Sequence, residues 1–138
     1  MNKIAIFLLT IMAGFFAKAQ EPAVLEEPVN GAKIVFAEKK HDFGDIKQGD
    51  VVEHVFEFEN VGNQPLILNQ PRTTCGCTTP TWPREPIAPG EKSSITVKFN
   101  SRGKIGVINK VVTVTSNAVN NIERISIETN IRLADTEG

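Results

Sequence analysis

Two cysteines separated by one glycine, Cys75-Gly76-Cys77, are the residues of this chain best suited to chemistry. In an extended strand their Cα atoms would lie about 6.6–7 Å apart, whereas a disulfide prefers about 5.5 Å, so a bond requires the turn that Gly76 permits. Three interpretations are open: a structural pair that shapes its loop, a redox-active pair, or a soft-metal site. Cu(I) is the metal expected there, because two thiolates can bind this soft ion.

For each chemical interpretation of the cysteines, the sequence lacks some of the residues that usually accompany such a site. A thiol–disulfide enzyme typically carries Cys-x-x-Cys at a helix N-terminus, and zinc would need two further ligands. His41 could serve as a distant third ligand only if the fold brings it near the thiols. His54 alternates with Phe56 along one strand, which predicts a half-buried, hydrogen-bonded imidazole. No catalytic motif stands out, so we expect no catalytic residues and no enzyme.

A proline-rich segment follows the cysteines and contains the only tryptophan of the chain. Prolines recur there every third residue, which is the period of a polyproline II helix, so they would share one edge: Pro80, Pro83, Pro86 and Pro89. Trp82 and Arg84 lie between them. Either Trp82 covers one end of the domain, or Trp82 and Arg84 form a contact patch for a partner, since both residue types are favoured as interface anchors.

The elements that must position these residues are strands. Alternation of apolar and polar residues with period two is clearest in 51–60, 94–100 and 122–132. The ranges 33–37, 66–68 and 107–117 also read as strands, and 41–46 reads as an extended segment. Residues 60–65 form a turn, because Asn and Gly tolerate positive φ. The segment between 68 and 94 is a long loop. About seven strands over residues 33–132 predict a single all-β domain, an immunoglobulin-like β-sandwich.

The start of the chain has the features of a cleaved secretory signal peptide, residues 1–19. Lys3 precedes an apolar run that is too short to span a membrane, and Ala17-Lys18-Ala19 fits a cleavage site. Residues 20–32 are expected to be a flexible lead-in and residues 133–138 a tail. Without Lys3 and Lys18, 13 basic residues face 16 acidic ones, so nucleic acid is an improbable partner. We expect a periplasmic or secreted protein without a membrane span.

Several local patterns together resemble one bacterial family. They are Asp42-Phe43-Gly44, then Asn60-Val61-Gly62 with Pro65-Leu66, then Cys75-Gly76-Cys77-Thr78, and Pro89-Gly90-Glu91 before an alternating strand. Over about residues 38–131 this combination resembles Domain of Unknown Function 1573. The resemblance implies an immunoglobulin-like fold related to the major sperm protein and PapD-like sandwiches. It implies no activity.

The sequence therefore predicts an exported, non-catalytic binding or structural module of the bacterial envelope, with a protein partner that the residues do not identify. The alternative is a Cu(I)-binding or thiol-redox protein that uses Cys75 and Cys77. A carbohydrate-contacting domain is a weaker third interpretation, because the sequence is poor in aromatic residues outside the expected core.

Overall fold

The computed structural model describes residues 29–134. The expected signal peptide, most of the lead-in and most of the tail lie outside these residues. Within 29–134 no helix is long and apolar enough to cross a membrane.

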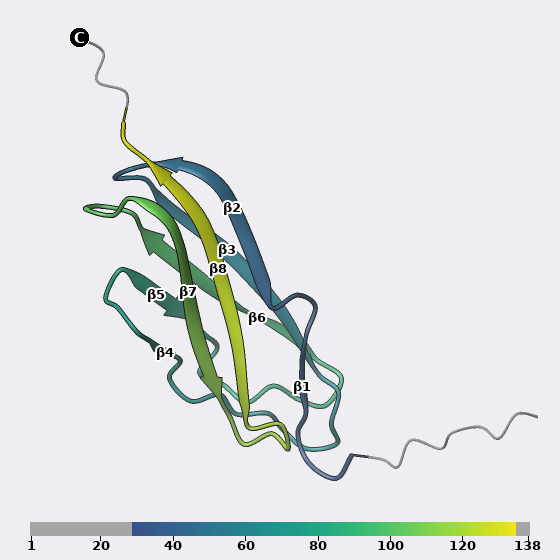
Figure 1. Cartoon of the computed structure of the whole chain (residues 1–138). Helices are drawn as coiled ribbons and strands as arrows, with labels where there is room; N and C mark the ends of the chain where they lie inside the picture. Colours follow the sequence, from purple (N-terminus) through teal and green to yellow (C-terminus); the bar gives the residue numbers. More distant parts are fainter. Residues whose placement is uncertain (1–28, 135–138) are drawn as a thin grey trace, which may run out of the picture.

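Eight strands in two four-stranded sheets make up the described part of the chain (Figure 1). The strands are β1 (Ile34–Phe36), β2 (Lys40–Lys47), β3 (Val51–Asn60), β4 (Arg72–Thr73), β5 (Thr78–Thr81), β6 (Lys92–Asn100), β7 (Gly106–Thr115) and β8 (Ile122–Arg132). The first sheet has the order β1-β3-β6-β5 and the second has the order β2-β8-β7-β4. The prediction of an all-β sandwich is confirmed.

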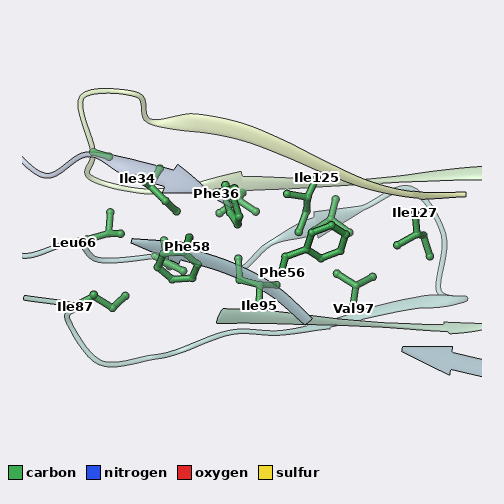
Figure 2. Packing of buried hydrophobic residues seen from close by; sticks show 14 of the residues in the cluster. Ile34, Phe36, Phe56, Phe58, Leu66, Ile87, Ile95, Val97, Ile125 and Ile127 are labelled. Atoms are coloured by element: carbon green, nitrogen blue, oxygen red, sulfur yellow. The ribbon is translucent and has the colours of Figure 1, made fainter. Parts of the chain in front are cut away.

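The core lies between the two sheets and is built from the inward-facing residues of the long strands. In β3, Phe56 and Phe58 are buried while Glu53 and Glu57 are exposed, as the alternation predicts. Figure 2 shows Phe56 of β3 pointing toward Ile125 of the other layer. The buried hydrophobic residues are Ile95, Val97 and Phe99 in the neighbouring strand β6, and Ile125, Ile127 and Ile131 in β8 of the other sheet.

The chain crosses between the sheets at both lateral edges. Residues 37–39 connect β1 of the first sheet to β2 of the second, and residues 74–77 connect β4 of the second sheet to β5 of the first. At the first crossing the Ala37 amide donates to the Glu57 carbonyl (2.9 Å), and the Ser126 amide donates to the Lys39 carbonyl (2.8 Å). Each crossing thus places its side chains at the rim of the layer between the sheets.

Two local predictions were wrong. Residues 66–68 do not form a strand: Leu66 makes an isolated bridge to Ile87, and Leu68 makes one to Ser116. These two leucines are nevertheless buried, so the apolar pattern reported burial rather than sheet pairing. The long loop after them contains two short strands, β4 and β5, which pair with β7 and β6.

Candidate functional site

The Cys75–Cys77 pair closes the connection between β4 and β5. The two sulfurs are joined in a disulfide, and the Cα atoms lie 5.3 Å apart. The carbonyl of Cys75 accepts hydrogen bonds from the Thr73 hydroxyl (3.1 Å) and the Thr78 amide (3.4 Å). The expected turn is present, but Gly76 does not adopt a positive φ in it. A Cβ at Gly76 would meet no atom within 4 Å, so the turn does not depend on glycine.

Both cysteines are half-buried, and Cys77 lines an open hollow on the surface of the first sheet. Its lining includes Cys77, Thr79, Lys98 and Asn100. The Cys77 carbonyl accepts a hydrogen bond from the Asn100 amide at 2.9 Å, which fixes the loop against β6. Lys98 is the charged residue in this lining. A thiol released by reduction would therefore face a small, open, partly polar surface.

His41 does not complete a metal site with the cysteines. It lies on β2, which is one edge of the second sheet, while the cysteine loop follows β4 at the other edge. The fold does not bring His41 near the two cysteines, so it is not placed to act as a third metal ligand beside them.

Trp82 and Arg84 contact one another directly. The Arg84 guanidinium carbon lies 4.3 Å from the centroid of the Trp82 ring, a cation–π arrangement. Trp82 is half-buried and packs against the core, whereas Arg84 is exposed. The prolines do not form one regular helix, because Pro80 belongs to β5 and Pro89 precedes a turn at Gly90. The polyproline II interpretation of the whole segment was wrong.

The two histidines meet at the edge of the sandwich where the chain crosses from β1 to β2. Their rings stack with centroids 3.6 Å apart and planes within 5° of parallel. His41 comes from β2 and His54 from β3, so the stack joins the two sheets. The carboxylate of Glu38, in the crossing segment, contacts His54 Nε2. One ligand-type atom from each of the three side chains lies within 4.8 Å of the others.

Aromatic rings border this cluster on the core side. Phe43 meets the His41 ring edge-on with a centroid distance of 4.6 Å, and Phe56 meets the His54 ring in the same way at 4.8 Å. Burial and the neighbouring His54 lower the pKa of His41, while the Glu38 carboxylate opposes that shift. His41 is consequently biased toward the neutral imidazole, the form that binds a metal or accepts a hydrogen bond.

The family model described as protein of unknown function (DUF1573) matches residues 34–131, which include β1 to β7 and all of β8 except Arg132. The chain belongs to this family. No curated protein matches the chain.

Solved structures similar to this DUF1573 protein share its fold. A protein of unknown function from Porphyromonas gingivalis W83 is 20% identical, with a TM-score of 0.61 over 79% of this chain and 50% of that one. The PapD-like domain 7 of human CEP192 is 13% identical, with a TM-score of 0.59 over 92% of this chain and all of that one. The secreted serine protease VesC from Vibrio cholerae is 14% identical, with a TM-score of 0.53 over 73% of this chain and 23% of that one.

These likenesses establish a PapD-like, immunoglobulin-like sandwich. The DUF1573 chain spans half the length of the Porphyromonas protein and about a quarter of the protease.

Asn60 is one of the residues that carried the family resemblance. In this DUF1573 domain its side chain links several segments by hydrogen bonds. Its side chain is fully buried. Its amide nitrogen donates to the carbonyls of Gln64 (2.8 Å) and Ile87 (2.9 Å), and its amide oxygen accepts from the amides of Gly62 (3.1 Å) and Lys33 (3.3 Å). One side chain therefore holds together three segments that are distant in sequence.

Gly62 is required by close packing rather than by a positive φ. A Cβ there would lie 2.1 Å from the Gly31 carbonyl oxygen and 2.6 Å from the Lys33 backbone nitrogen. Neither Asn60 nor Gly62 has a positive φ, so the reason given for this turn in the sequence analysis was wrong.

The histidine cluster is the arrangement that the sequence analysis missed. His54 is half-buried and bonded to Glu38, as its strand position suggested, but its stacking on His41 was not foreseen. A signal was present: His-x-Phe occurs in both β2 and β3, so each histidine lies on the inward face two positions before a phenylalanine. Only the spatial neighbourhood of the two strands turns that repeat into a site.

Proposed function

We propose that this DUF1573 domain is an exported, non-catalytic binding module that pairs an extended segment of another protein with the open edge of β7. The observation that carries the proposal is that β7 is fully paired on one side and mostly unpaired on the other. The strand pairs with β8 along its whole length, whereas on its other side β4 covers only Val112 and Thr113. Within the described residues, the backbone of 106–111 has no strand on that side.

The side chains along this open edge are more apolar than an ordinary solvated edge. Val107 is 73% exposed, Ile105 immediately before the strand is 58% exposed, and Val111 is 36% exposed. Val107 and Val111 share the outer face of β7 with Asn109. Natural edge strands are usually protected by charges, prolines or bulges, so an uncovered edge with exposed valines favours pairing with another strand.

The partner that fits this edge is an extended segment with apolar residues at alternate positions. Backbone hydrogen bonds to residues 106–111 would supply affinity, and contacts with Val107 and Val111 would supply selectivity. Export to the periplasm or the extracellular space is part of the proposal and rests on the apolar run and the Ala17-Lys18-Ala19 site near the start of the chain.

Photo-crosslinking in the producing cell tests the proposal. A benzophenone side chain at position 107 should yield a discrete crosslinked species with an envelope protein. The same group at Val119, which is 56% exposed on a loop, should not yield it. A second variant, Asn109→Pro, which disrupts the backbone of the edge, should abolish the species. Identical products from positions 107 and 119, or none from position 107, would refute the edge as the binding surface.

A second candidate function is favoured by the half-buried cysteines at the rim of the hollow beside Lys98: Cu(I) binding or thiol redox chemistry after reduction. Intact mass and thiol titration of the purified protein, before and after Cu(I) is offered, test it. Two titratable thiols with one copper ion bound per chain would place this function first. A mass two hydrogens low with no metal uptake would leave Cys75 and Cys77 a structural bridge.

A further inference from the structure

We propose that Glu38, His41 and His54 form a binding site for a divalent transition ion of borderline softness, with Zn²⁺ the reference ion. The site lies at the edge of the sandwich where the chain crosses from β1 to β2. It is separate from the β7 edge, because β2 and β7 are not neighbours in their sheet.

The three side chains converge from three segments. Each offers one ligand-type atom, and these atoms lie within 4.8 Å of one another. Glu38 is delivered by the crossing segment, which is fixed at both ends by the Ala37 amide bonded to β3 and the Lys39 carbonyl bonded to β8. The backbone on both sides of Glu38 is therefore held by hydrogen bonds, one to each sheet, which positions this one ligand before an ion arrives.

Ring nitrogens in the cluster are open to an incoming ion. Among the hydrogen bonds of residues 29–134, His54 Nε2 contacts Glu38, but no protein group bonds to the ring of His41. No side-chain nitrogen or oxygen in the described part is both buried and without a partner, so the His41 nitrogens are reached by solvent. The cluster therefore offers an imidazole without a hydrogen-bond partner next to a carboxylate at the same rim.

Neighbouring charges also favour a cation. The two lysines closest in sequence are engaged elsewhere: Lys39 pairs with Glu123 at 2.6 Å, and Lys40 pairs with Glu128 at 2.5 Å. The Glu38 carboxylate lies opposite His54 and is about half exposed. An ion would thus meet a negative ligand and two imidazoles rather than a positive rim.

The donor set selects the class of metal. Two imidazole nitrogens and one carboxylate oxygen suit Zn²⁺ and similar divalent ions, and they suit Cu(I) less well, because that soft ion prefers sulfur. Three protein ligands leave a fourth tetrahedral position for water or a partner's side chain.

Binding must separate the stacked rings. A metal lies close to the plane of each imidazole that binds it, and two parallel planes 3.6 Å apart share no such point. His41 is half-exposed on an edge strand, so its ring can turn away from His54. Loss of the ring-current shifts of both imidazoles is therefore an expected signature of binding at this site.

Calorimetric titration of the purified protein with Zn²⁺, with imidazole NMR spectra recorded alongside, tests the proposal. One ion should bind per chain, and the imidazole resonances should move as the stack opens. Glu38→Gln should weaken binding about tenfold or more, the least expected from loss of a metal-site partner. His41→Gln should abolish it.

Two control variants should bind Zn²⁺ as the wild type does. Glu53→Gln removes a carboxylate beside His54 in sequence but on the exposed face of β3, and Cys75→Ser/Cys77→Ser removes both cysteines of the chain. Glu38 lies in an exposed connection, so its variant decides the question even if a histidine variant fails to fold. No stoichiometric binding, unchanged affinity in Glu38→Gln, or loss of binding only in the cysteine variant would overturn the proposal.

Discussion

Replacing Asn60 by alanine should remove a large part of the stability of this domain. The substitution deletes four side-chain hydrogen bonds, to Gln64, Ile87, Gly62 and Lys33, from a fully buried position. A typical hydrogen bond contributes about 1 kcal/mol net, and the backbone groups left behind cannot all reach water. We therefore expect a loss of about 4 kcal/mol.

That loss is large compared with the 5–15 kcal/mol that usually separates folded from unfolded states of a domain. At about 4–8 °C per kcal/mol for a domain near this size, the melting temperature should fall by roughly 20 °C. Urea unfolding followed by circular dichroism measures the free energy, and a thermal scan measures the midpoint.

Asn121→Ala is the matched control, because Asn121 is exposed and makes no side-chain hydrogen bond within residues 29–134. It should change the unfolding free energy by less than about 0.5 kcal/mol. If Asn60→Ala and Asn121→Ala lose the same small amount, the hydrogen bonds of Asn60 do not hold the three segments together, and the reasoning fails. Asn60→Asp should also destabilise the domain, since it turns a donor toward two carbonyls into an acceptor.

Two further predictions concern packing and pH. Gly62→Ala should cost about 1–3 kcal/mol in urea unfolding, because its Cβ would overlap the backbone of residues 31–33; a neutral effect would contradict the close approach. Hydrogen bonds from Lys39 and Asn120 hold the pKa of Glu123 below its ordinary value of 4.5, although burial acts to raise it. This contribution to stability is complete above about pH 4.5 and disappears as the pH falls through the lower folded-state pKa. Glu123→Gln should therefore flatten the pH dependence of the unfolding free energy below about pH 4.5, and an unchanged slope would show that Glu123 is not linked to folding.

The fold was predictable from the sequence where burial and strand period coincide. Strands β3, β6 and β8 alternate strictly because one face packs into the core and the other meets water. The segment 66–68 was misassigned because Leu66 and Leu68 are buried without belonging to a strand. β4 has two residues, too few for any period to be visible.

The candidate sites differ in how much of each could be predicted from the sequence. Cys75 and Cys77 are separated by a single residue, so their pairing is local and could be considered from the sequence spacing alone. His41 and His54 meet only because β2 and β3 belong to different sheets that face one another at the crossing edge. No periodicity within one strand encodes a contact between two sheets, which is why the histidine cluster required the structure.

The position of β8 also determines when the domain can fold. Among the strands of residues 29–134, β8 is synthesised after all the others, yet it lies between β2 and β7. It is also the only described strand that pairs with β2, in parallel, with Lys40 opposite Ser126. Until residues 122–132 are made, β2 has no strand to pair with and β7 pairs only with the two residues of β4. The second sheet is then incomplete and leaves part of the apolar face of the first sheet uncovered. Such long-range pairing slows folding and makes it a late event. A chain that stays unfolded until its final strand is complete can be threaded through a membrane pore, as the proposed export requires.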